Sequence, residues 1–111
     1  MPRRRRHAPQ NLPRAWHWTD DANCSDEDPS VFFPNGTTGL ALLDIRYAKS
    51  ICRACPVRSA CLDHALNFRE DHGVWGGLDE DERAEVLRAK REAAERQRRR
   101  ARTRARAASA A

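Results

Sequence analysis

Apolar residues recur at helical spacing in the middle of this chain. Within residues 38–52, Leu40, Leu43, Tyr47 and Ile51 follow one another at intervals of three and four positions. This spacing places side chains on one face of an α-helix. Further apolar side chains, Ile45 and Ala48, lie between them. The pattern predicts a helix that runs up to Cys52.

Two further helices follow in the sequence. One begins at Cys55-Pro56, because proline suits the first helical position, where its missing N–H costs nothing. Its predicted inner face consists of Val57, Cys61, Leu62, Ala65 and Leu66. A tight turn, Gly73-Val74-Trp75-Gly76-Gly77, then interrupts the chain. The last helix starts near Asp79, which has capping-box spacing to Glu82.

The remaining segments carry weaker signals. Residues 16–36 combine prolines with polar residues and are predicted to be mostly loop. The last helix runs into an Arg-rich tail without apolar periodicity, and we expect it to fray there because it has nothing to bury. No strand pattern or internal repeat is present in the sequence. The predicted fold is a small all-α cluster of about three to four helices with disordered basic termini.

Charge divides the chain into three parts. Residues 15–87 hold six basic and fourteen acidic residues, whereas residues 88–106 carry ten basic residues against two glutamates. We therefore expect a disordered basic arm over residues 1–15, a folded body over 16–90 and a basic tail over 91–111. A body of this size is marginal without a covalent or metal cross-link.

The sequence also suggests where the protein works. No apolar run approaches the ~20 residues that cross a membrane, and no apolar segment follows the N-terminal arginines as in a secretory signal. We therefore expect a cytoplasmic protein without a membrane partner. In that compartment, clustered cysteines are more often metal ligands or redox groups than structural disulfides.

All four cysteines lie in the acidic body. Cys24 is followed, after a long gap, by Cys52, Cys55 and Cys61 in a Cys-x2-Cys-x5-Cys arrangement. This spacing predicts a four-thiolate site but does not identify the metal, since zinc and iron–sulfur centres both use four cysteines. Two disulfides are a further alternative. The four histidines add little, because four cysteines already complete a ligand shell.

Several separate motifs follow one another over roughly residues 16–90. They are Ala22-Asn23-Cys24, Asp28-Pro29, Phe32-Phe33-Pro34, Cys52-Arg53-Ala54-Cys55-Pro56-Val57, Cys61-Leu62, Ala65-Leu66, Gly73-Val74-Trp75-Gly76-Gly77-Leu78 and Glu82-Arg83. In this order they resemble the WhiB-like proteins of actinobacteria, and in particular the short members of that family.

The resemblance implies a cofactor and a partner. It implies one [4Fe–4S] cluster on Cys24, Cys52, Cys55 and Cys61. It also implies a redox- or nitric-oxide-responsive transcription factor that binds the C-terminal domain of the primary sigma factor. The aromatic contacts carried over from the family are Trp18, Phe32, Phe33 and Trp75, beside the turn glycines Gly73, Gly76 and Gly77.

The Arg-rich tail adds a second partner. Runs of like charge are usually interaction tails, and arginine binds phosphate through its bidentate fork. We therefore expect the tail to contact promoter DNA. Its candidate contacts are Arg96, Arg98, Arg99, Arg100, Arg102, Arg104 and Arg106.

We predict no catalytic residues and no small-molecule substrate. Two other hypotheses stay open from the sequence. One is a thiol–disulfide reductase that uses Cys52 and Cys55 in the metal-free form, because Cys-x2-Cys is a redox spacing. The other is a structural zinc protein that binds nucleic acid through its basic arms alone.

Overall fold

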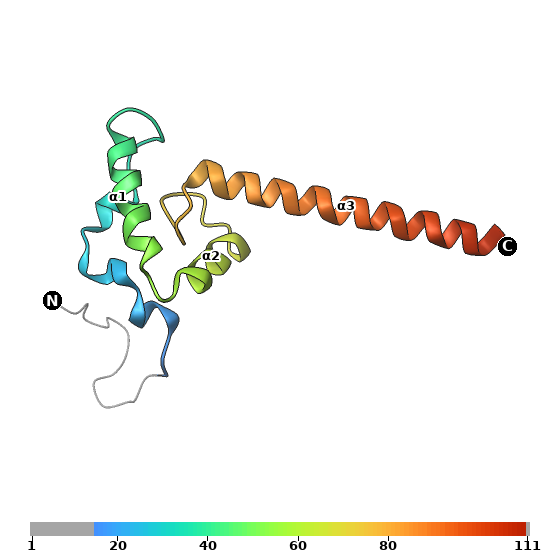
Figure 1. Cartoon of the computed structure of the whole chain (residues 1–111), viewed down its shortest axis with the longest axis horizontal. Coiled ribbons are helices and arrows are strands. Elements are labelled where there is room, and N and C mark those ends of the chain that lie inside the picture. Colours follow the sequence, from blue (N-terminus) through green and yellow to red (C-terminus); the bar gives the residue numbers. More distant parts are fainter. Residues whose placement is uncertain (1–14, 111) are drawn as a thin grey trace.

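The computed structural model describes residues 15–110 and consists of a small body from which one long helix projects (Figure 1). Three short 3-10 helices form the N-terminal part of the body. Three α-helices follow. The elements are η1 (Trp18–Asp21), η2 (Asn23–Asp26), η3 (Pro29–Phe32), α1 (Ala41–Arg53), α2 (Arg58–Asn67) and α3 (Glu80–Ala110). Within residues 15–110 there is no strand, which agrees with the predicted all-α class.

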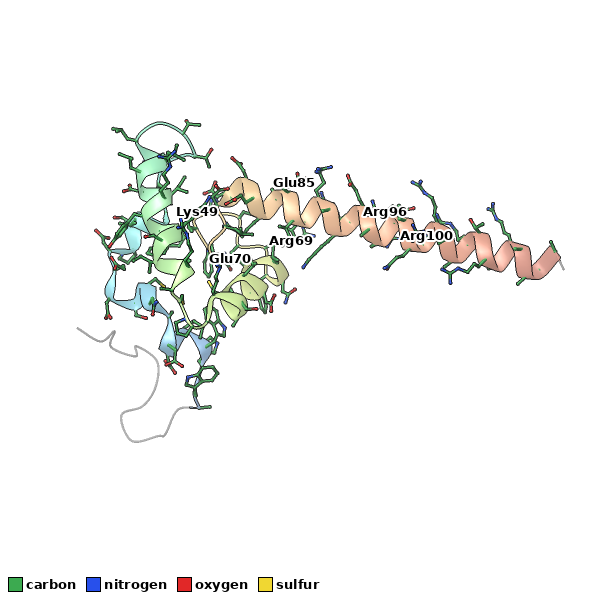
Figure 2. The ribbon with its side chains drawn as sticks, viewed as in Figure 1. Lys49, Arg69, Glu70, Glu85, Arg96 and Arg100 are labelled. Carbon is green, nitrogen blue, oxygen red and sulfur yellow. The ribbon has the colours of Figure 1, made fainter. Side chains whose placement is uncertain are left out.

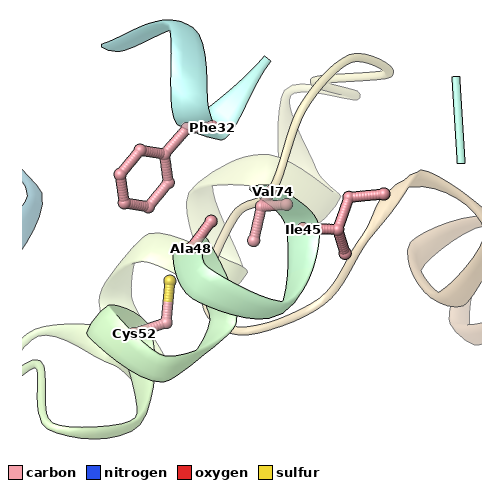
Figure 3. Packing of buried hydrophobic residues seen from close by; sticks show 5 residues of the cluster. All are labelled: Phe32, Ile45, Ala48, Cys52 and Val74. Carbon is pink, nitrogen blue, oxygen red and sulfur yellow. The ribbon is translucent and has the colours of Figure 1, made fainter. Parts of the chain in front are cut away.

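A small apolar core lies between α1, η3 and the glycine-rich turn. Phe32 from η3 and Val74 from the turn pack on the α1 side chains Ile45, Ala48 and Cys52 (Figure 3). The three α1 residues are spaced by three and four positions and so share one helix face. The core therefore closes directly onto one of the four cysteines.

Of the four apolar residues that reveal helix α1 in the sequence, only Ile51 packs, partly buried, against the core. Leu40, Leu43 and Tyr47 remain 85%, 61% and 48% exposed, whereas Ile45 is 2% exposed. Periodicity locates a helix, but two apolar stripes on the same helix satisfy the same spacing. Packing against η3 and the turn selects the stripe that includes Ile45.

Three sets of polar contacts hold the base of α3 in place. Asp79 and Glu82 form the predicted capping box, with reciprocal N–H to carboxylate bonds of 3.0 and 2.9 Å. From α1, the Lys49 ammonium lies 3.0 Å from Asp79 and 2.6 Å from Glu82 (Figure 2). Arg83 is 3% exposed and donates to the carbonyl oxygens of Leu78 and Glu70.

The expectation that the tail frays is wrong for the described residues. The helix α3 continues without interruption from Glu80 to Ala110. Alanine, arginine, glutamate and glutamine are among the best helix formers, and this segment contains neither glycine nor proline. Pairs such as Arg98 with Glu95, three residues apart, add local support. Helix propensity therefore outweighs the lack of a buried face.

The opening of the second helix also differs slightly from its prediction. Cys55 and Pro56 lie in the turn that precedes α2, and α2 itself begins at Arg58. The predicted basic arm lies, except for Ala15, outside the described residues. No helix within residues 15–110 is long and apolar enough to cross a membrane.

Candidate metal centre

The four cysteines, which come from separate segments, line one cavity. It has a volume of about 320 Å³. Cys24 enters from η2, Cys52 from the last turn of α1, Cys55 from the turn after it, and Cys61 from α2. Among the described residues, no three metal-ligating side chains converge tightly enough to hold a single metal ion. The four thiols nevertheless share one cavity, and the charges of the other three act on Cys61.

Backbone amides of the glycine-rich turn point at two of these sulfurs. Burial raises the pKa of the Cys61 thiol to about 11, and a hydrogen bond from the Gly76 amide offsets part of that rise. Burial likewise raises the pKa of Cys52, and the Gly77 amide offsets part of it. Amide donors favour sulfur in its anionic form, which is the form that binds metals.

Arg58 connects α2 to the turn. Its Nε donates to the Gly76 carbonyl oxygen at 3.2 Å, and its positive charge favours the thiolate form of Cys52. It also lines the cavity. One guanidinium thus holds the turn in place and lowers the cost of negative charge on the sulfurs.

Close packing requires glycine at Gly73 and Gly76, and a left-handed backbone favours it at Gly77. A Cβ on Gly73 would lie 2.6 Å from the Phe32 oxygen, and one on Gly76 would lie 2.5 Å from the Leu62 Cβ. Gly76 and Gly77 have φ of +57° and +83°, which side chains disfavour. Only glycine lets the amides approach the sulfurs this closely while the turn rests on α2.

Aromatic side chains border the cavity. Trp18, Phe32, Phe33 and Trp75 all line it, so the structure brings together every aromatic residue singled out in the sequence. Phe32 is 6% exposed and belongs to the core, whereas Phe33 is 50% exposed. The Phe33 ring meets Trp75 edge-on, with ring centroids 6.4 Å apart.

His64 is a member of this aromatic group that sequence reasoning did not assign. Its ring stacks on Trp75 at a centroid distance of 5.5 Å and lies 5.6 Å from Trp18 and 4.9 Å from Phe68. His64 follows Cys61 by three residues and so lies on the same face of α2, a spacing that could have predicted its place beside the cavity. His64 joins Trp18 and Trp75 into one continuous surface next to the cavity.

The arginines predicted for DNA contact lie apart from the cavity. All seven are exposed and belong to the distal half of α3, which Figure 1 shows extending away from the body. The structure therefore separates the candidate metal centre from the basic tail, and a single continuous helix joins them.

The fold and site define a small all-α protein in which four thiols line a cavity bordered by aromatic rings. The family model described as "Transcription factor WhiB" matches residues 18–86. The chain belongs to the WhiB family, and its relatives are transcriptional regulators.

Individual relatives agree with this assignment. Transcriptional regulator WhiB1 of Bifidobacterium longum is 51% identical over 74 residues, which cover 67% of this chain and 80% of the relative. WhiB1 of Mycobacterium tuberculosis is 52% identical, over 64% of this chain and 84% of the relative. The redox- and pH-responsive transcriptional regulator WhiB3 of M. tuberculosis is 43% identical, over 72% and 84%.

Proposed function

We propose that this WhiB-family regulator holds one [4Fe–4S] cluster on Cys24, Cys52, Cys55 and Cys61. We further propose that it binds the C-terminal domain of the primary sigma factor through its aromatic surface and contacts promoter DNA through α3. The observation that carries the proposal is that all four cysteines and the four predicted aromatic contacts line one cavity.

The donor set fits such a cluster. Four thiols and two amide donors, from Gly76 and Gly77, meet at the cavity, and hydrogen bonds to sulfur are among the features that tune iron–sulfur centres. When bound, the cluster supplies a centre that oxidants or nitric oxide attack.

The same thiols are poorly suited to reductase chemistry. A thiol–disulfide reductase needs a cysteine that is readily ionised. Burial instead raises the pKa of Cys52, the first cysteine of the Cys-x2-Cys pair, which opposes the ionisation that this chemistry needs. The raised pKa favours a ligand role, in which the metal displaces the proton, over a nucleophilic role.

The aromatic surface has the composition of a protein interface. Tryptophan and phenylalanine are enriched among interface anchors, and Phe33 is half exposed at the cavity rim. Phe32 supports that rim from the core. Because the anchors and the sulfurs share one cavity, loss of the cluster would deform the sigma-binding surface, which couples redox state to transcription.

The cofactor is tested on protein purified without oxygen. We expect about four iron and four sulfide per chain with a brown chromophore, and a Cys55→Ser variant that no longer retains them. One zinc per chain without colour would contradict the cluster and favour the zinc alternative.

Sigma binding is tested with the isolated C-terminal domain of the sigma factor and the cluster-loaded protein. Phe33→Ala should weaken binding more than tenfold, as expected for a central anchor. The matched control is Leu43→Ala on α1, since Leu43 is more exposed, at 61%, but does not line the cavity. Equal binding by both variants would contradict the proposed surface.

A further inference from the structure

The arginines of distal α3 fall on two sides of the helix. Arg96, Arg100 and Arg104 are spaced by four residues and therefore lie within about 80° of the helix circumference. We call these three residues the open row. Arg98, Arg99 and Arg102 occupy about 100° centred on the other side, with Arg99 about 60° from Arg96. We call these the clamped set.

The two groups differ in their partners. Glu95 lies 2.8 Å from Arg98, 3.3 Å from Arg102 and 4.0 Å from Arg99, so one carboxylate serves the whole clamped set. Nearer the start of α3, Arg88 pairs with Glu85 and Glu92. The side chains of the open row make no ion pair or hydrogen bond with any described residue; Figure 2 shows two of them, Arg96 and Arg100.

This difference bears on phosphate binding. Exposed ion pairs are weak, worth about 0–1 kcal/mol, so the clamped arginines could turn away from Glu95. The Glu95 carboxylate would nevertheless remain on that side and repel an approaching phosphate. The open row has one carboxylate at its start, Glu92, which lies one turn before Arg96 and pairs with Arg88. No carboxylate lies beside Arg100 or Arg104, whose guanidinium groups offer bidentate forks to phosphate.

We propose that α3 binds duplex DNA as a continuous helix with a defined face, the open row lying against the phosphate backbone. This inference rests on the proposed contact between the tail and DNA. Successive members of the row rise about 6 Å along the helix, so they can engage neighbouring phosphates together. Glu95 keeps the clamped set from contributing, and thereby limits the affinity for non-specific DNA.

The test compares two triple variants of the full-length chain that remove equal charge. One is R96Q/R100Q/R104Q in the open row, and the other is R98Q/R99Q/R102Q in the clamped set. Glutamine keeps the helix propensity of arginine, and circular dichroism verifies equal helix content. Affinity for a labelled DNA duplex is measured by fluorescence anisotropy over a series of salt concentrations.

We expect the open-row variant to lose more than tenfold in affinity at 0.15 M salt. The slope of log affinity against log salt should fall by about three, one unit for each lost phosphate contact. The clamped-set variant should lose less than about threefold, with a slope change of less than about one. A third variant, E95Q, should bind a few-fold more tightly than the natural sequence, because it releases the clamped set.

The possible outcomes distinguish failure of the open row from failure of the proposed DNA contact itself. Equal losses in both triple variants would overturn the open row while leaving a DNA-binding tail in place. An E95Q variant that binds no more tightly would overturn the role of the clamp. No loss in either triple variant would overturn the DNA contact itself, and the open row with it.

Discussion

The body and the distal half of α3 are held together in different ways. In the body, contacts join residues far apart in sequence: the Val74 amide donates to the Phe32 oxygen at 2.8 Å, and Arg58 reaches Gly76. Beyond Arg88, the ion pairs of α3 join residues no more than seven positions apart. The body thus depends on individual residues, whereas the tail depends on composition, and the two should respond differently to substitution.

The largest effect is expected at the glycine-rich turn. Gly76→Ala places a Cβ 2.5 Å from Leu62 at a φ of +57°, so we expect a loss of at least about 3 kcal/mol in the free energy of unfolding. Urea unfolding followed by tryptophan fluorescence measures it, because all three tryptophans lie in the body.

Gly39→Ala is the matched control for this loss. Gly39 has a φ of +64°, and a Cβ there would meet nothing within 4 Å. It should cost only the left-handed strain of about 1–2 kcal/mol. A Gly76→Ala variant no less stable than this control would show that the turn is not tightly packed.

The next largest effect is expected at the base of α3. Arg83→Met leaves the carbonyl oxygens of Leu78 and Glu70 without the donor they have now. Loss of donors to such part-buried oxygens should cost about 2–3 kcal/mol. Arg88→Met, one turn further along, breaks only exposed pairs with Glu85 and Glu92 and should cost less than about 1 kcal/mol. Comparable losses of stability from both variants would mean that the part of α3 held by the body extends beyond Arg88.

A pH effect of roughly 2 kcal/mol is expected in the body of the metal-free, reduced protein. Burial raises the pKa of Cys61 to about 11 from an ordinary value of 9.0. The folded chain therefore keeps a proton that the unfolded chain loses, and stability present below pH 9 declines as the pH approaches 11. Urea midpoints across this range measure the decline. Cys61→Ala should make the decline shallower, leaving the part that comes from the raised pKa of Cys52, and an unaltered slope in that variant would assign the decline to other groups.

The smallest effect on the body is expected from breaking the tail. Ala101→Pro interrupts α3 well beyond its last contact with the body and should lower the helix signal in circular dichroism. The urea midpoint reported by tryptophan fluorescence should stay unchanged. A shifted midpoint would mean that distal α3 contributes to the stability of the body after all.

Local signals in the sequence predicted the local parts of the fold. The capping box at Asp79 and Glu82 depends only on residues three positions apart, and it forms as predicted. Burial in α1 could not be predicted in the same way, because the choice between Leu43 and Ile45 depends on packing against η3 and the turn. The tail stays helical where fraying is predicted, because helix propensity outweighs the lack of a buried face.

In the candidate site, too, local features could be predicted from the sequence, whereas features that depend on tertiary packing could not. Cys52 and Cys55 are neighbours in sequence, and their spacing alone marks a thiolate pair. The amides of Gly76 and Gly77 reach the sulfurs only because the turn folds back onto α2, and no short motif encodes that contact. The role of Arg58 at the Gly76 oxygen was missed for the same reason.

The burial of Arg83 has a consequence for how far and in which direction the tail reaches. With its base fixed at Leu78 and Glu70 and no glycine or proline along its length, α3 acts as a ruler. It carries Arg96 about 20 Å from Arg83. One residue inserted before Arg96 would turn the open row by about 100°, whereas seven would lengthen the ruler by about 10 Å and nearly restore its orientation. The distance and direction between the body and the DNA would then change with the number of inserted residues as helix geometry dictates, which a flexible linker would not require.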